Sequence, residues 1–230
     1  MYTTVLLDLD DTLWDFSKSA KISLQQMYNE LKLSRWFDSV EQFITIYKVK
    51  NTQMWEEYGR GEITKEFLAL ERFAHPLREV NCSEMELAQK MSEIFLGLTN
   101  KNLVLIDGAV ELLEYLNPKY KLAAVSNGFV EAQYVKLDSS GLGKYFSHII
   151  LSEEIGLHKP DVKFFEKALQ ITATNRENAV VIGDNFDSDV LGAQNAGIDA
   201  IYFDRGLKGV KNISNSIKMV SELCEIATIL

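Results

Sequence analysis

The stretch Val5-Leu6-Leu7-Asp8-Leu9-Asp10-Asp11-Thr12-Leu13-Trp14 places three carboxylates within four residues, directly after an apolar run. Carboxylates this close repel one another, so they need a cation, a shared proton or full solvation. We interpret residues 4–9 as a strand that is buried on both faces of a parallel sheet. Such a strand would deliver Asp8 and Asp10 to an active site at its C-terminal end.

The composition of the 230-residue chain suits a globular protein, because 47% of its residues are hydrophobic. The net charge of −9 argues against binding to a nucleic-acid backbone, which would need a basic surface. A small phosphorylated substrate stays compatible, since a metal ion and a few basic residues can outweigh the global charge. No stretch approaches the roughly 20 apolar residues of a membrane span, and the first apolar run stops at Asp8, so we expect neither a membrane segment nor a signal peptide. We expect a cytoplasmic protein with Cys82 and Cys224 as buried free thiols.

Residues 17–96 have helical periodicity throughout and no convincing strand. The pattern predicts four helices: one that includes residues 22–31, one over about 39–58, one from Thr64 to near Pro76 with Phe67 inside, and one that Ser83 caps. Four successive helices without a strand are typical of an all-helical insertion. We therefore expect a helical domain over residues 17–100 and a second domain formed by residues 1–16 plus 101–230.

Strands and helices alternate from about residue 103 onward. The predicted strands cover residues 121–125, 148–151, 179–182 and 200–203. The predicted helices cover residues 109–116 and 130–137, a segment opened by Pro160 that runs through residue 169, residues 188–195, and a terminal segment around Leu223. This alternation predicts an α/β fold with a Rossmann-like doubly wound parallel sheet as its core. In such sheets, polar sites form outside the carboxyl ends of the strands.

Several predicted strands end in a polar residue: Asp8, Ser126 and Asp184. A set of three or four carboxylates without histidine or cysteine suits Mg²⁺ rather than zinc. Hydroxyl groups and a lysine such as Lys159 bind anions, so the combination could hold a phosphoryl group and neutralise its oxygens. One carboxylate could attack phosphorus to form an aspartyl-phosphate, and a second carboxylate two residues further on could protonate the leaving oxygen.

Four ordered motifs resemble those of the haloacid dehalogenase (HAD) superfamily, in its phosphatase arm. They are Asp8-Leu9-Asp10-Asp11-Thr12, Ser126-Asn127, Lys159-Pro160 and Gly183-Asp184-Asn185-Phe186-Asp187-Ser188-Asp189. Each motif alone is weak, but the ordered set spans nearly the whole chain. The helical stretch between the first two motifs occupies the position of the type 1 helical cap of that superfamily.

The resemblance implies a role for each matching residue. Asp8 would be the nucleophile and Asp10 the general acid/base. The implied phosphate-binding residues are Thr12, which would also steady the loop, Ser126, Asn127 and Lys159. The implied Mg²⁺ ligands are Asp8, Asp10 through its backbone carbonyl, Asp184, and Asp189, which would ligate through water or orient Lys159. Asp11 is expected to be a solvated or structural acid, and His158 is not included in the catalytic set.

Within the phosphatases, the chain resembles the bacterial pyrimidine 5′-nucleotidases. The matching segments are residues 10–16, residues 55–64 and Arg72-Phe73. The resemblance implies hydrolysis of nucleoside 5′-monophosphates. We expect a monomer or weak homodimer. The candidate specificity residues are Trp14, Trp55, Tyr58 and Arg60. Arg60 is the better candidate, because aromatic residues in a helical cap usually belong to its core.

Other functions are compatible with parts of the pattern. A phosphatase of another small metabolite, such as a sugar phosphate or phosphoglycolate, would use the same motifs. A dehalogenase is disfavoured because it needs no acid at position 10, where this chain has Asp10. A phosphoacceptor signalling domain is disfavoured by the second acid on the same strand end and by the long helical insertion. Ser126 could also act only as a helix cap, although capping and anion binding use the same end of a helix.

Overall fold

The computed structural model of the protein describes residues 1–82, 84–206 and 217–230. The chain divides into two compact units, one made of residues 1–15 and 104–230 and the other of residues 16–103. The sequence placed these divisions after residues 16 and 100, and the structure places them after residues 15 and 103.

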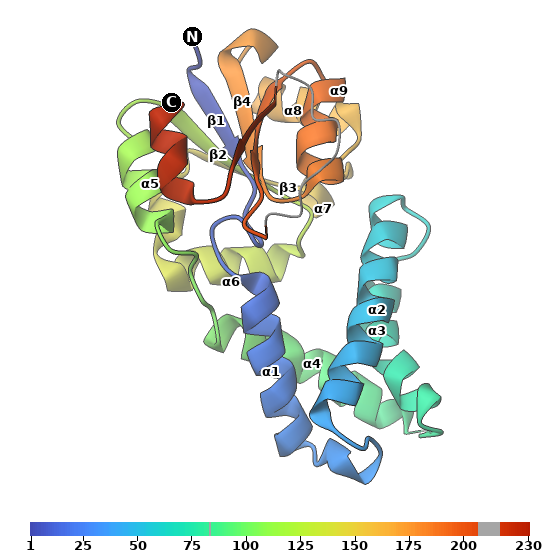
Figure 1. Ribbon diagram of the computed structural model, residues 1–230. Helices are drawn as coiled ribbons and strands as arrows, with labels where there is room; N and C mark the ends of the chain where they lie inside the picture. The colour runs from blue at the N-terminus through green and yellow to red at the C-terminus, as the bar shows by residue number, and fades with distance from the viewer. Residues whose placement is uncertain (83, 207–216) are drawn as a thin grey trace. The chain divides into compact units, whose positions relative to one another are not determined.

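The first unit is built on a six-stranded sheet with the order β3-β2-β1-β4-β5-β6, in which all neighbouring strands are parallel (Figure 1). The strands are β1 (Thr4–Leu7), β2 (Lys121–Ser126), β3 (His148–Leu151), β4 (Ala179–Gly183), β5 (Asp199–Phe203) and β6 (Ile217–Val220). The doubly wound parallel sheet predicted from the sequence is confirmed. Because the strand order reverses at β1, the carboxyl end of β1 lies at the topological switch point, where such sheets form their sites.

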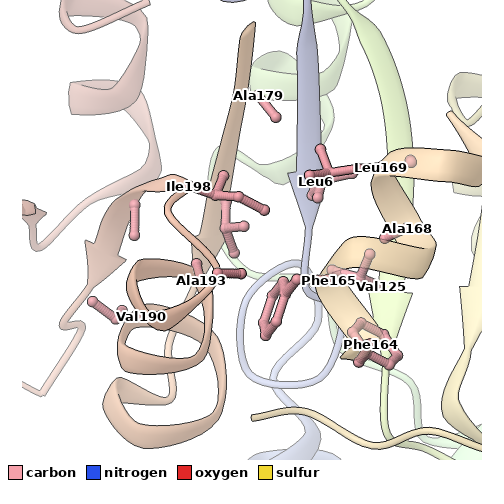
Figure 2. Packing of buried hydrophobic residues seen from close by; sticks show 14 of the residues in the cluster. Leu6, Val125, Phe164, Phe165, Ala168, Leu169, Ala179, Val190, Ala193 and Ile198 are labelled. Atoms are coloured by element: carbon pink, nitrogen blue, oxygen red, sulfur yellow. The ribbon is translucent and has the colours of Figure 1, made fainter. Parts of the chain in front are cut away.

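The two central strands β1 and β4 are buried along their whole length. Leu6 packs on one face with Val125 of β2, Val181 of β4 and Phe165 of α8 (Val162–Ile171), as Figure 2 shows in part. Figure 1 shows α5 (Ala109–Leu116) on the opposite face. Helices on both faces explain why β1 reads as a continuous apolar run rather than as an alternating one. The residue that follows β1 is therefore held by a rigid element.

The remaining elements of this unit agree with the predicted alternation, with several corrections. They are α6 (Val130–Ser140), α7 (Ser152–Ile155), the π-helical turn η4 (Phe186–Leu191) continued by α9 (Gly192–Asn195), and short 3₁₀ turns. Strand β6 was missed, because it is a short strand at the sheet edge with two exposed central residues. The expected terminal helix is a 3₁₀ turn over Leu223–Thr228, and Cys224 on it is exposed rather than buried.

The start of α8 also differs from the prediction. Pro160 was expected in the first turn, but the helix begins at Val162. Asp161 caps it, because its carboxylate accepts a hydrogen bond from the N–H of Lys163 (2.9 Å). Pro160 thus precedes the cap.

The second unit contains α1 (Phe16–Glu30), α2 (Val40–Gly59), α3 (Lys65–Glu79) and α4 (Met85–Lys101), so the all-helical insertion is confirmed. Its core includes the rings of Tyr47, Phe73 and Phe95, whose centroids lie 5.1–5.8 Å apart. None of the helices in the described ranges is long and apolar enough to cross a bilayer.

The third and fourth helices of this unit differ from the prediction in detail. Helix α3 continues through Pro76 to Glu79, because proline removes only one backbone hydrogen bond and the flanking Leu77 is buried. Phe67 was expected inside, but 52% of its surface is exposed. Ser83, the expected cap of the fourth helix, lies outside the described residues.

Candidate active site

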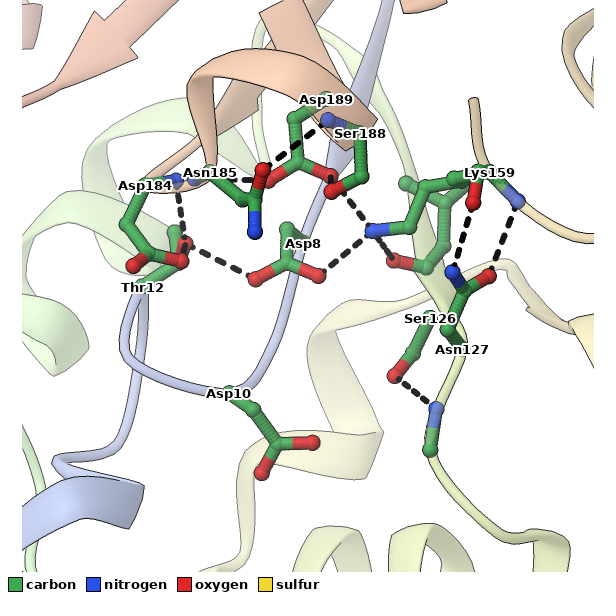
Figure 3. Close-up of polar contacts among 12 residues, drawn as sticks. Asp8, Asp10, Thr12, Ser126, Asn127, Lys159, Asp184, Asn185, Ser188 and Asp189 are labelled. Carbon is green, nitrogen blue, oxygen red and sulfur yellow. Dashed lines mark hydrogen bonds and ion pairs between the residues drawn. The ribbon is translucent and has the colours of Figure 1, made fainter. Parts of the chain in front are cut away.

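Asp8 is the first residue beyond β1, at the edge where the parallel strands end. Its backbone N–H donates to the carbonyl of Ile182 in β4 (2.9 Å), which extends the pairing of the two strands by one residue. Its side chain is buried. Oδ1 accepts a hydrogen bond from Lys159 Nζ (2.7 Å), and Oδ2 accepts one from the Thr12 hydroxyl (2.9 Å), as Figure 3 shows. Side chains from two other segments therefore fix both carboxylate oxygens.

Lys159 reaches this point from the loop between α7 and α8. Besides the bond to Asp8, its Nζ donates to Asp189 Oδ1 (2.6 Å) and to the carbonyl of Val125 (3.1 Å). The Asn127 side chain holds the lysine backbone through two hydrogen bonds, to its carbonyl (2.8 Å) and from its N–H (2.9 Å). Burial alone would lower the pKa of Lys159, but the two carboxylates outweigh it and raise that pKa. The lysine is thus a fixed, permanent cation inside the site.

Three carboxylates gather around this cation. Ligand oxygens of Asp8, Asp184 and Asp189 lie within 4.8 Å of one another. Burial raises the pKa of Asp8 to about 7 and that of Asp184 to about 8, and the neighbouring carboxylates add to both shifts, while Lys159 opposes them. The single positive charge of Lys159 therefore does not neutralise the negative charge of the three carboxylates. Closely spaced, buried oxygen donors with unrelieved negative charge fit a hard divalent cation such as Mg²⁺.

Thr12 joins two of these carboxylates. Its hydroxyl donates to Asp8 and accepts a hydrogen bond from the backbone N–H of Asp184 (3.1 Å), so it links the ends of β1 and β4. The sequence assigned Thr12 to phosphate binding. In this structure its hydroxyl lies 2.9 Å from Asp8 Oδ2 and 3.5 Å from Asp184 Oδ1, so Thr12 braces these carboxylates, and its role in phosphate binding stays a prediction.

Asp189 is positioned by the π-helical turn η4, a kind of turn that is frequent at functional sites. The Asn185 side chain caps this turn by accepting a hydrogen bond from the N–H of Ser188 (3.0 Å). Gly183 precedes the turn at the end of β4, and a Cβ atom there would overlap the Asp189 carboxylate. Only glycine lets this carboxylate lie directly against the strand end. The sequence predicted a single helix over residues 188–195. The structure instead has a π-helical turn over Phe186–Leu191, followed by a short α-helix.

Asp10 lies apart from the three clustered carboxylates and has its own partners. Oδ1 accepts hydrogen bonds from the Trp14 indole N–H (2.7 Å) and from Lys136 Nζ, while Oδ2 accepts one from the Gln133 amide. Burial opposes ionisation of Asp10, but the Lys136 charge and these hydrogen bonds outweigh it and hold its pKa below the usual range. In this structure Asp10 is therefore an ionised carboxylate.

Ser126 ends β2, next to β1 in the sheet. Its hydroxyl oxygen accepts hydrogen bonds from the backbone N–H of Gly128 (3.0 Å) and from the Gln133 amide (2.9 Å). Ser126 does not cap α6, because this helix begins only at Val130 and accepts no side-chain cap from Ser126. The structure brings Asp8, Asp10, Thr12, Ser126, Asn127, Lys159, Asp184 and Asp189 to one edge of the sheet.

The four predicted specificity residues differ in burial and lie in different parts of the chain. Trp14 is fully buried and donates to Asp10, so it offers no exposed ring on which a base could stack. Tyr58 is buried in the helical unit, with its ring 5.7 Å from that of Trp55. Arg60 is exposed and pairs with Glu62 (2.7 Å).

The sequence analysis missed two residues that contact the site, Gln133 and Lys136. Both are buried on α6, whereas Tyr134 and Val135 of the same helix are exposed by 42% and 47%. A signal was present in the sequence: the positions of α6 at helical spacing, 133, 136 and 137, carry two long polar side chains where an apolar stripe would be expected.

Comparison with known proteins identifies the class of enzyme. A family profile described as haloacid dehalogenase-like hydrolase matches residues 5–203, so the chain belongs to this family of hydrolases, as the four motifs predicted. The pyrimidine 5′-nucleotidase PynA of Streptococcus pneumoniae is 31% identical over 88% of this chain and 84% of its own. The pyrimidine 5′-nucleotidase YjjG of Escherichia coli is 30% identical over 87% of this chain and 85% of its own. The structure of the HAD-hydrolase YfnB from Bacillus subtilis, described as bound to magnesium, matches with a TM-score of 0.89 at 26% identity, covering 99% of this chain and 98% of that one.

Proposed function

We propose that this protein is a Mg²⁺-dependent phosphomonoester hydrolase that acts through an aspartyl-phosphate. The observation that carries the proposal is the environment of Asp8: a buried carboxylate oriented by Lys159 and Thr12, with Asp184 beside it and Asp10 two residues further on. An oriented carboxylate next to a permanent cation and a metal-binding cluster is suited to attack a phosphoryl group.

The proposed reaction has two steps. The reaction starts once Asp10, which is ionised in the substrate-free structure, has taken up a proton from solvent as the negatively charged phosphoryl group binds beside it. An oxygen of Asp8 attacks phosphorus, the bond from phosphorus to the leaving oxygen breaks, and Asp10 gives that oxygen its proton. Water then attacks the phosphorus of the aspartyl-phosphate, its proton passes to Asp10, and the bond to Asp8 breaks. Inorganic phosphate leaves and both carboxyl groups return to their starting states.

The other residues of the site are proposed to bind the metal and the phosphoryl group. Asp8, Asp184 and the Asp10 carbonyl would hold Mg²⁺, which would offset the repulsion between nucleophile and phosphoryl oxygens. The Ser126 hydroxyl, the Asn127 N–H and Lys159 would bind the phosphoryl oxygens. The contact between Asp189 and Lys159 supports an orienting role for Asp189 in this scheme.

We propose nucleoside 5′-monophosphates as substrates. The support is the similarity to two pyrimidine 5′-nucleotidases over more than four-fifths of each chain. Trp55, Tyr58 and Arg60, all on the helical unit, remain candidates for nucleoside selection.

The test is a phosphate-release assay with Mg²⁺ on UMP, dTMP, IMP, sugar phosphates and phosphoglycolate. The expected result is highest kcat/KM on UMP and dTMP, no activity with EDTA, and no activity of Asp8→Asn under any condition. A preference for a sugar phosphate would replace the nucleotidase assignment but keep the phosphatase. Activity of Asp8→Asn equal to the wild type would overturn the mechanism.

A further inference from the structure

Helix α6 carries a polar pair on its buried side. Gln133 and Lys136 lie one turn apart, and 0% and 3% of their surfaces are exposed. Burying an amide and an ammonium group costs free energy unless strong partners compensate it. Both residues direct these groups at the same carboxylate, that of Asp10.

The pair engages both oxygens of Asp10. The Gln133 amide donates to Oδ2, and Lys136 Nζ contacts Oδ1, which also accepts from the Trp14 indole N–H. Lys136 Nζ also lies 5.0 Å from the centroid of the Trp14 ring. Donors from two separate segments, the loop after β1 and α6, thus fix the rotation of the Asp10 side chain.

Gln133 acts on a second residue as well. The same amide nitrogen donates to the hydroxyl oxygen of Ser126 (2.9 Å), which also accepts from the N–H of Gly128. A hydroxyl has two acceptor lone pairs and one proton, so two incoming donors leave Ser126 as a donor. Its proton is then available to an anion at the strand ends.

The surroundings of Gln133 require this arrangement. A Cβ atom at Gly128 would overlap its amide group, so a larger residue in this loop would force the Gln133 side chain to shift. The Gln133 carbonyl oxygen is buried and accepts no hydrogen bond from the described residues. Leaving that oxygen unsatisfied costs free energy, which indicates that the two N–H contacts set the orientation of the side chain.

We propose that Gln133 and Lys136 are positioning residues, which orient the Asp10 carboxyl toward the leaving oxygen and the Ser126 hydroxyl toward the phosphoryl group. This inference rests on the proposed phosphatase function. It assigns different effects to the two residues: Lys136 acts through Asp10, and Gln133 acts through both Asp10 and Ser126.

The test compares two substrates on the same enzyme samples. UMP has a poor leaving group that needs a proton, whereas p-nitrophenyl phosphate has a good one that needs little acid assistance. For Lys136→Met we expect kcat on UMP to fall about 10- to 100-fold and kcat on p-nitrophenyl phosphate to fall less than about 3-fold, since general acid catalysis contributes about 10²–10⁴. Gln133→Leu should add a rise in KM for both substrates. Lys136→Arg, which keeps the charge, should keep the wild-type ratio of the two kcat values.

Matched controls exist on α8, where Lys167 and Gln170 have the same residue types and spacing but are exposed. Lys167→Met and Gln170→Leu should leave both activities unchanged. The kcat ratio within one sample does not depend on the folded fraction, so partial unfolding cannot imitate the expected effect. Unchanged ratios in Lys136→Met and Gln133→Leu, or a ratio in Lys136→Arg as altered as in Lys136→Met, would overturn the inference. A wild-type enzyme that hydrolyses neither substrate with Mg²⁺ would instead refute the proposed function.

Discussion

The Nζ atom of Lys159 lies 2.7 Å from Oδ1 of Asp8, although the two residues are 151 positions apart in the chain. The contact is buried and shared with Asp189. It joins the loop before α8 to the end of β1, so the nucleophile candidate is oriented by the segment that connects β3 to β4.

Lys159→Met should destabilise the protein and abolish activity. Removing the cation leaves the two buried carboxylates that pair with it, those of Asp8 and Asp189, without their compensating charge. Loss of one partner of a buried ion pair costs about 3–5 kcal/mol. The free energy of unfolding, measured with urea in EDTA, should fall by that amount, and Mg²⁺ should restore part of it. The exposed Lys167→Met is the control, and equal stabilities of the two variants would contradict the prediction.

The response to Mg²⁺ should depend on pH. The pKa values of Asp8 and Asp184 rise from 3.8 to about 7 and about 8. Groups with raised folded-state pKa values favour the metal-free folded protein below their unfolded value, and this contribution is lost as the pH rises through the folded values. Mg²⁺ needs the ionised carboxylates, so it competes with protons.

We therefore expect the metal-free melting temperature to fall between about pH 5 and pH 8 through these two groups. The increase on adding Mg²⁺ should be larger at about pH 8 than at about pH 6. Asp184→Asn should raise the metal-free melting temperature at the higher pH and reduce the Mg²⁺ response. A Mg²⁺ response that is larger at the lower pH would disprove the assignment of these carboxylates.

Asp10→Asn should separate acid catalysis from nucleophilic attack. We expect turnover of UMP to slow by about 10²–10⁴-fold, because the amide cannot protonate the leaving oxygen. Turnover of p-nitrophenyl phosphate should fall less, and Mg²⁺ binding, followed by the thermal shift, should be largely kept. Equal losses on both substrates would show that Asp10 has a different role.

Gly128→Ala should disturb the site from the backbone side. A methyl group there would overlap the Gln133 amide, and such overpacking costs about 1–3 kcal/mol. Stability and activity on UMP should both fall. Gly97 in α4 is the matched control, because a Cβ there meets no atom within 4 Å, and Gly97→Ala should stabilise the protein by about 0.5–1 kcal/mol. A Gly128→Ala variant as stable and active as the wild type would show that Gln133 can shift without consequence.

The strands next to the site were predictable because they are short apolar runs that end in polar residues. Residues 148–151 were predicted with the observed bounds, and β1 and β4 nearly so. Asp8, Ser126 and Asp184 were predictable because parallel strands bring their carboxyl ends to one edge. Lys159, in the loop between α7 and α8, was predicted from the resemblance of its motif to the family. By contrast, tertiary packing decides three features: the pairing of β6, the end of α3 and the exposure of Phe67. Local periodicity in the sequence does not determine tertiary packing.

The sequence by itself determined the class of fold, the family and which carboxylates share one edge of the sheet. The tertiary structure decided what each group does there. Thr12 donates a hydrogen bond to Asp8, and Trp14 donates one to Asp10. Gln133 and Lys136 contact Asp10 from α6. The physical reason is that strand alternation is a local property, whereas a buried charge depends on whichever distant donors can reach it. Asp8 and Asp10 are two residues apart, yet Asp8 lies in the cluster of three carboxylates and Asp10 faces a lysine on α6.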